Sequence, residues 1–211
     1  MSTNLSVAMT EMSKSRPSIP SIMQRPLIVG ASVSADWKAK SPGKLLALRY
    51  TEESQIRTVA FGGKSGREVL KKVSDDSLSD RTAVIGLDLF FWDAMMKTPD
   101  ESLHALNTLM TVVKAKQIPI ILGEVPNLLP GFQPQAARLN EAMHKAAQGY
   151  HACTVVPFTS MLFQILREGA LHYNGLRYGL KELIPDGLHI GSIASQYIAD
   201  TLYDMLLTDN R

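Results

Sequence analysis

Short apolar runs alternate with longer amphipathic stretches from residue 26 to the end of the chain. Each apolar run is bounded by Gly, Pro or polar residues, which is the pattern of a short buried strand. The run at 82–91 is nearly all apolar and therefore predicts a central strand covered on both faces. The predicted strands occupy residues 26–30, 56–61, 82–91, 118–122 and 151–156.

The stretches between these runs place apolar residues at helical spacing. Leu106, Met110 and Val113, for example, recur on one face of a single helix. Ser65 is placed to cap a helix that begins near Arg67. The predicted helices occupy residues 67–73, 99–116, 135–148 and 191–207.

This alternation of strand and helix predicts a three-layer α/β/α sandwich with a central five-stranded parallel sheet, of the flavodoxin-like kind. No internal repeat or linker divides the pattern, so residues 25–211 are expected to form a single domain. In such sheets the chemistry gathers at the carboxyl ends of the strands. The candidate functional residues should therefore follow the predicted strands.

Residues 1–24 are rich in Ser, Thr and Pro and carry no sustained apolar run. A secretory signal needs an apolar stretch of roughly 7–15 residues, so this segment is expected to be a flexible tail or an arm packed on the domain. A cytoplasmic location follows as an expectation. A secreted or periplasmic location stays open, because a chain that has lost its leader would look the same.

The composition argues against nucleic-acid binding, membrane spanning and cysteine-based sites. The 211 residues include 22 Lys and Arg and 20 Asp and Glu, which gives a net charge of +2. So small a charge provides no basic surface for nucleic acid. No stretch reaches the roughly 20 apolar residues of a membrane span. The single cysteine, Cys153, cannot form an internal disulfide or build a cysteine-based zinc site. No metal or organic cofactor is expected.

Two short motifs could carry chemistry. Ser32 directly follows the first predicted strand, where a turn can expose its hydroxyl next to free backbone N–H groups. Asp186 and His189 stand three residues apart, directly before the last predicted helix. A histidine next to a carboxylate can take a proton from a serine hydroxyl. Each motif also has an ordinary structural interpretation, since Ser commonly caps helices and Asp-Gly commonly forms turns.

Read together, the two motifs resemble the SGNH (GDSL-type) hydrolases, over residues 27–207. The segment Gly30-Ala31-Ser32-Val33-Ser34 matches the family's Gly-Asp-Ser-Leu-Ser with Ala in place of Asp, and Asp186-Gly187-Leu188-His189 matches the family's last block. The resemblance implies an esterase that forms an acyl-enzyme on Ser32, with His189 as general base and Asp186 orienting it. It also implies a small-molecule ester substrate, whose identity the sequence leaves open.

The same resemblance implies an oxyanion hole made by the backbone N–H groups of Ser32 and Gly66, with Gly63 as the alternative to Gly66. The family's third donor is an Asn after the central strand, and here Asp88 stands at that position. An ionised carboxylate cannot donate a hydrogen bond. Asp88 is therefore protonated, turned away to brace a loop, or the mark of a degenerate site, and the second outcome is favoured.

The sequence leaves further alternatives. The aromatic residues Phe90, Phe91 and Trp92 leave the central strand, and core packing is the favoured interpretation of them. If one ring instead lines an acyl or leaving-group pocket, Trp92 is the best candidate. A non-catalytic ligand-binding module on the same fold is the main alternative to an enzyme, because fold does not fix function. A nucleotide binder that uses Gly62–Gly66 as a phosphate cradle is a weaker one, since that loop lacks both the Walker and the Rossmann glycine spacing.

Overall fold

The five predicted strands form one parallel sheet in the order β2-β1-β3-β4-β5. This computed structural model describes residues 17–126, 131 and 133–209. The order places β1 and β3 side by side although β2 lies between them in sequence, which is the flavodoxin-like arrangement. The strands are β1 (Pro26–Gly30), β2 (Arg57–Ala60), β3 (Ala83–Gly86), β4 (Ile120–Gly123) and β5 (Cys153–Val156).

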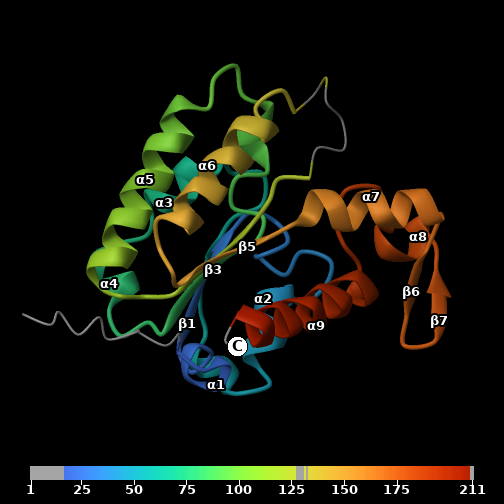
Figure 1. Ribbon diagram of the computed structural model, residues 1–211, viewed down its shortest axis with the longest axis horizontal. Helices are drawn as coiled ribbons and strands as arrows, with labels where there is room; N and C mark the ends of the chain where they lie inside the picture. The colour runs from blue at the N-terminus through green and yellow to red at the C-terminus, as the bar shows by residue number, and fades with distance from the viewer. Residues whose placement is uncertain (1–16, 127–130, 132, 210–211) are drawn as a thin grey trace, which may run out of the picture.

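Helices cover both faces of this sheet (Figure 1). Side chains of one strand alternate between the two faces: Leu27 and Val29 join the core on the α5–α6 side, and Ile28 joins the core on the α9 side. The first face carries α3 (Gly66–Leu70), α4 (Asp75–Leu78), α5 (Asp100–Ala115) and α6 (Ala136–Gln148); the second carries α1 (Ile19–Ile22), α2 (Pro42–Ala47) and α9 (Ser192–Asp209).

One sequence expectation needs correction here. The apolar run at 82–91 is not one strand, because β3 ends at Gly86 and the chain then turns. Leu89 and Phe90 are buried within that turn, so the run stays apolar after the strand has ended. Residues 1–24 were expected to be a flexible tail or an arm packed on the domain, and over α1 the chain is packed, with Ile19 and Ile22 buried against α9. Residues 1–16 lie outside the described part of the chain.

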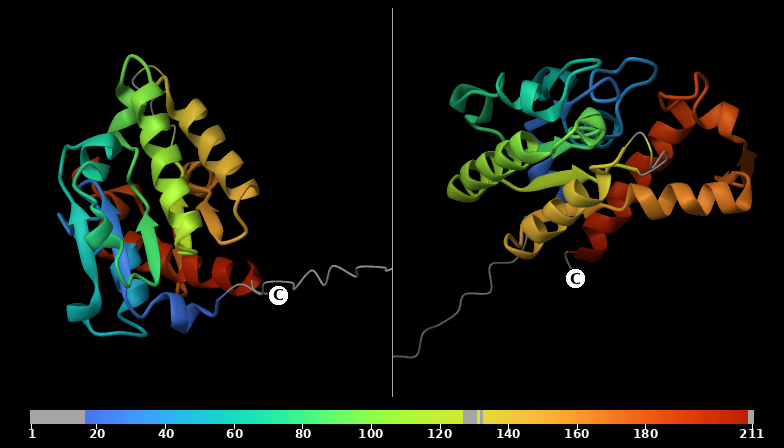
Figure 2. Two further views of the ribbon diagram at one scale, coloured as in Figure 1. Left: turned by 90° about the vertical axis from the view of Figure 1, so that its left-hand side faces the viewer. Right: turned by 90° about the horizontal axis from the view of Figure 1, so that it is seen from above.

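Residues 158–183 follow β5 and form two helices and a two-stranded hairpin outside the main sheet; this segment is called the excursion. The sequence patterns did not predict it. Figure 2 shows it extending beside the three layers. Its two short strands are joined by an Asn174-Gly175 turn in which both residues have positive φ, 51° and 76°, as a tight hairpin requires. The excursion consists of α7 (Phe158–Glu168), β6 (Leu171–Tyr173), β7 (Leu176–Tyr178) and α8 (Leu180–Leu183).

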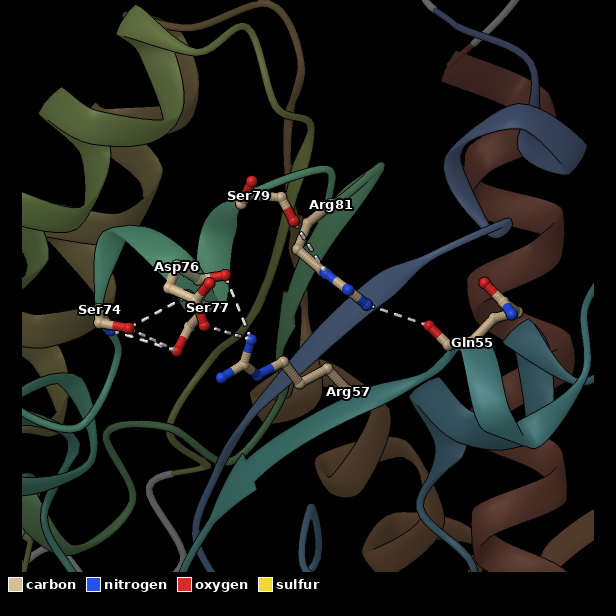
Figure 3. Close-up of polar contacts among 7 residues, drawn as sticks. All are labelled: Gln55, Arg57, Ser74, Asp76, Ser77, Ser79 and Arg81. Carbon is tan, nitrogen blue, oxygen red and sulfur yellow. Dashed lines mark hydrogen bonds and ion pairs between the residues drawn. The ribbon is translucent and has the colours of Figure 1, made fainter.

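Arginine side chains tie together the amino ends of the strands. Arg57, at the start of β2, donates to the backbone carbonyl of Asp76 in α4 at 3.2 Å, and Arg81 donates to the carbonyl of Gln55 at 3.1 Å (Figure 3). Gln55 belongs to a short 3-10 helix, η1 (Glu53–Gln55). These contacts lie at the edge of the sheet opposite the carboxyl ends, so they stabilise the fold away from the candidate site. Among the described residues, no helix is long and apolar enough to cross a membrane.

Close packing at the carboxyl edge depends on glycine. A methyl group added to Gly123, the last residue of β4, would lie 2.1 Å from the carbonyl oxygen of Leu87. Because that neighbour is backbone, it cannot move aside as a flexible side chain would. Gly123 thus allows the loop after β3 to lie against the end of β4.

We expect Gly123→Ala to lower the free energy of unfolding by about 1–3 kcal/mol, the usual cost of overpacking. Gly149→Ala is the matched control, because Gly149 has a negative φ and an added methyl group there would be no closer than 3.4 Å to any neighbour. Urea denaturation of both variants measures the difference. Equal stabilities would show that the loop after β3 is not packed against β4 in this way.

Candidate active site

Ser32 lies in a tight turn at the carboxyl end of β1. The turn is closed by backbone hydrogen bonds from Ala35 N–H to the Ala31 carbonyl and from Trp37 N–H to the Ser32 carbonyl, both 3.1 Å long. Ser32 is 8% exposed, and within the described part of the chain its hydroxyl makes no hydrogen bond. The turn therefore presents an unengaged hydroxyl at the sheet edge where chemistry is expected.

Asp186 and His189 form a hydrogen-bonded pair at the same edge. The Asp186 Oδ2 atom lies 2.8 Å from Nδ1 of His189, and Oδ1 accepts the backbone N–H groups of His189 at 2.7 Å and Leu188 at 3.1 Å. These N–H groups and the imidazole hold the pKa of Asp186 well below its ordinary value. An ionised Asp186 keeps a proton on Nδ1 and leaves Nε2 of His189 able to accept one.

The Trp37 ring lies between the Ser32 turn and the loop that carries Asp186 and His189. The ring stacks on the imidazole of His189, with centroids 6.1 Å apart and planes 22° apart. A methyl group added to Gly62 would lie 3.4 Å from the same Trp37 ring and 3.8 Å from Cβ of Ser32. Ser32 and His189 therefore lie on the same side of the molecule, around one aromatic ring. The described contacts include no direct hydrogen bond between their side chains.

The loop that carries Trp37 is itself held in place. Asp36 has a positive φ of 57°, a conformation that Asp adopts more readily than most residues. Its carboxylate accepts the backbone N–H of Ser41 at 2.7 Å and pairs with Lys44. Sequence reasoning overlooked Trp37, and the only available signal was an aromatic residue in the loop that follows Ser32.

Asp88 turns toward the backbone of the Ser32 turn. Its Oδ2 accepts the N–H groups of Val33 at 2.9 Å and Ser34 at 3.3 Å, and its Oδ1 accepts the Ser34 hydroxyl at 2.6 Å. Gly30 makes room for this contact, since a methyl group there would lie 2.1 Å from Oδ1. The carboxyl group thus joins the end of β3 to the turn after β1.

Removal from water raises the pKa of Asp88, and its hydrogen bonds from Ser34 and the neighbouring N–H groups oppose that rise. The side chain is only partly buried by accessible area, but the space that it faces is an apolar cavity rather than bulk water. The loss of water therefore affects the pKa of Asp88 more than its hydrogen bonds do. This carboxyl group favours its neutral form more than an exposed aspartate does.

Gly66 does not have a free N–H group. It donates to Oδ2 of Asp93 at 2.5 Å, and Oδ1 of Asp93 accepts the Ser102 hydroxyl at the same distance. Asp93 is fully buried in the 3-10 helix η2 (Trp92–Met95), so this link anchors the start of α3 to the interior. The donor that the resemblance assigns to Gly66 is already engaged. Gly62, rather than Gly66 or Gly63, is the glycine found next to Ser32.

A cavity of about 250 Å³ adjoins the site. Val33 and Leu188 line it, and they are the chain neighbours of Ser32 and His189. Trp92, the candidate wall residue from the sequence, does not line it; its ring packs edge-on against Phe91 with centroids 5.4 Å apart. Aromatic and sulfur-containing wall residues do come from this segment, namely Phe90, Phe91 and Met95.

The described residues include no cluster of His, Cys, Asp or Glu side chains arranged to hold a metal ion. The groups of this site that could carry chemistry are the serine hydroxyl, the histidine–aspartate pair and the backbone N–H groups around them.

Solved structures of similar fold exist for this chain, although its sequence alone finds no relatives. No family model matches the chain, and no curated protein matches it. The psychrotrophic esterase EstA from Pseudoalteromonas sp. is 19% identical, with a TM-score of 0.60 over 87% of this chain and 96% of that one. A lipase/acylhydrolase from Enterococcus faecalis is 15% identical, with a TM-score of 0.63 over 87% and 95%.

The α/β hydrolase LAE5 from the metagenome of Lake Arreo is 17% identical, with a TM-score of 0.65 over 89% of this chain and 97% of that one. Further similar structures include a lipolytic protein of the G-D-S-L family from Desulfitobacterium hafniense. The chain has the fold of the SGNH (GDSL-type) hydrolases, as its end motifs indicated.

Proposed function

We propose that this protein is a serine esterase that uses Ser32, His189 and Asp186. The observation that carries the proposal is the hydrogen-bonded Asp186–His189 pair at the same sheet edge as the unengaged Ser32 hydroxyl. Neither motif would suffice alone, because a serine without a base is a weak nucleophile. The esterases and acylhydrolases of similar fold support the same reaction class.

The reaction proceeds in two halves. Ser32 Oγ attacks the ester carbonyl carbon while His189 Nε2 takes its proton, and His189 then gives that proton to the departing alcohol. Water, deprotonated by His189, attacks the resulting acyl-enzyme and releases the acid together with free Ser32. Asp186 keeps the imidazole in the correct tautomer and stabilises its charged form. The Ser32–His189 hydrogen bond forms as substrate binds, since such bonds are often long without it.

The oxyanion is stabilised by two backbone donors. The first is the Ser32 N–H group, at the start of the turn. The second comes from the turn at Gly62, which lies against Ser32 and closes with a 3.3 Å hydrogen bond from Lys64 N–H to the Phe61 carbonyl. Gly66 is excluded from this role because its N–H group binds Asp93.

Asp88 acts as a brace in this mechanism. Its carboxyl group accepts hydrogen bonds from the N–H groups of Val33 and Ser34, and so fixes the backbone that directly follows Ser32. An ionised carboxylate would repel the developing oxyanion. The raised pKa of Asp88 reduces that repulsion by favouring its neutral form.

A non-catalytic ligand-binding module is the second candidate. It is favoured by the carboxyl group at position 88, where the resembled family has an amide donor, and by the lack, among the described hydrogen bonds, of one between the Ser32 and His189 side chains. A fluorophosphonate probe separates the two candidates, because it reacts only with an activated serine. Labelling of Ser32 supports the enzyme, and ligand binding without labelling supports the module.

We expect Ser32→Ala to lower kcat for short p-nitrophenyl esters by about 10³–10⁶-fold, because removing a triad nucleophile abolishes the covalent route. His189→Ala should have a similar effect. The control is Ser160→Ala, which changes an exposed serine of α7 whose hydroxyl donates to the carbonyl of Pro157, the residue before the helix. Equal activity in Ser32→Ala and the unaltered protein would remove Ser32 from the reaction.

The pKa shift of Asp88 predicts how stability depends on pH. Its pKa in the folded protein is raised above the ordinary 3.8, so the folded state binds more protons than the unfolded state. Stability from this group is therefore present below pH 3.8 and is lost as the pH rises through the folded-state pKa.

We expect Asp88→Asn, which cannot ionise, to gain Tm relative to the unaltered protein as the pH rises above 3.8, and then to reach a plateau. Asp186, whose pKa is lowered, acts below pH 3.8 and contributes equally to both proteins. Thermal unfolding across the pH range measures the difference. Parallel Tm profiles for the two proteins would mean that Asp88 is not desolvated.

A further inference from the structure

We infer that Trp37 binds the alcohol portion of the ester, and that the preferred alcohol carries an aromatic ring next to its hydroxyl-bearing carbon, as benzyl alcohol does. The contact that points to this role is the stacking of the Trp37 ring on the imidazole of His189. This inference rests on the proposed esterase function and specifies one side of its substrate.

Trp37 is exposed, but its loop is held in place. At 64%, its exposed fraction is the largest of any large apolar side chain in residues 17–126, 131 and 133–209. The preceding residue, Asp36, accepts the backbone N–H of Ser41 at 2.7 Å and pairs with Lys44. A ligand that covers this indole ring removes apolar surface from water, which is favourable, and the loop has little freedom left to lose.

The position of Trp37 matters more than its exposure, since single exposed apolar residues are common. In the first half of the proposed reaction the departing alcohol takes its proton from Nε2 of His189, which brings the alcohol oxygen to about 3 Å from that atom. The other ring nitrogen, Nδ1, faces Asp186 at 2.8 Å. The indole and imidazole centroids are 6.1 Å apart. A group attached to the alcohol oxygen therefore lies within reach of the Trp37 ring.

Trp37 is separate from the apolar cavity at the ends of β3 and β4, which it does not line. It lies instead against the turn at Gly62, after the edge strand β2, where an added methyl group would be 3.4 Å from two atoms of the indole ring. A substitution of Trp37 therefore changes the surface beside His189 and leaves the wall of the cavity intact.

The surroundings of Trp37 favour an aromatic alcohol over a sugar. Aromatic rings stack on an indole or meet it edge-to-face, and such pairs are worth more than their buried area alone. Leu188, which precedes His189, is 45% exposed, and Phe61 in the neighbouring turn is 44% exposed. A sugar needs partners for its hydroxyl groups, but the lysines of these loops are each paired with a carboxylate. These pairs, at 3.0–3.7 Å, are Lys38 with Asp186, Lys40 with Glu53 and Lys64 with Glu68.

The test is the ratio of kcat/KM for benzyl acetate to kcat/KM for cyclohexylmethyl acetate. The two alcohols are similar in size, only benzyl alcohol is aromatic, and their intrinsic reactivities cancel when the ratio is compared between proteins. We expect Trp37→Leu to lower this ratio by about 2–12-fold, the worth of one aromatic pair, and Trp37→Phe to retain most of it. An unchanged ratio in Trp37→Leu would overturn the inference, and so would a greater loss for an acetylated sugar than for benzyl acetate.

Fluorophosphonate labelling separates this role from an effect on His189 alone. The leaving group of the probe is fluoride, so it offers no alcohol for Trp37 to bind, yet it still needs an activated Ser32. Labelling should therefore proceed at the unaltered rate in Trp37→Leu. A fall in labelling that matches the fall for benzyl acetate would mean that Trp37 only holds the imidazole, and would overturn the alcohol assignment.

Phe163→Leu is the matched control, because Phe163 is an aromatic residue of α7 that is 57% exposed and does not line the cavity. Its ester ratio and its labelling rate should both equal those of the unaltered protein, and a fall in the ratio as large as that in Trp37→Leu would overturn the assignment to Trp37. Absence of both ester hydrolysis and Ser32 labelling in the unaltered protein would instead overturn the esterase proposal itself.

Discussion

The contact between Asp88 and the turn that carries Ser32 determines the geometry of the candidate site. It joins β3 to β1, two strands that are neighbours in the sheet but are separated by β2 in sequence. Parallel strands that neighbour each other in this way leave a crevice at their carboxyl ends. One carboxyl group lies across that crevice and hydrogen-bonds to two backbone N–H groups and one hydroxyl. The rest of the site is arranged around this junction.

Two carboxyl groups near Ser32 have opposite environments, and their roles follow from that difference. Asp186 is exposed and receives hydrogen bonds from its own loop, so its pKa is lowered and it can keep the His189 tautomer fixed. Asp88 faces an apolar cavity, and its removal from water raises its pKa. Opposite pKa shifts of nearby carboxyl groups are a common way to separate roles within one site.

The excursion after β5 packs beside the end of the sheet and borders the cavity. Its helix α7 has no fully buried residue, yet its apolar face closes one side of the cavity. The ends of the main sheet thus carry the candidate reacting groups, and the peripheral unit contributes one wall of the adjoining cavity. This division agrees with the general observation that one fold serves many reactions through its attached loops.

Much of the fold follows from local patterns. Short apolar runs and helical spacing identified the five strands and the helices α5, α6 and α9, because burial on a strand or helix leaves a regular period in the sequence. These patterns failed after Gly86, because Leu87, Leu89 and Phe90 are apolar residues buried in the turn after β3 and do not continue the strand. They also missed α7 and the Asn174-Gly175 hairpin, although the hairpin turn has a sequence signal.

For the site, the sequence by itself determined that Ser32 follows a strand and that Asp186 lies three residues before His189, a spacing short enough for one loop to pair them. Only the tertiary structure decided that Trp37 and Gly62 lie between these motifs, that Gly66 donates to Asp93, and that Asp88 braces the turn. The physical reason is that each of these contacts joins residues far apart in the chain or on different elements. Which N–H group a carboxylate takes, and which ring lies against an imidazole, depends on how the strands and loops pack together.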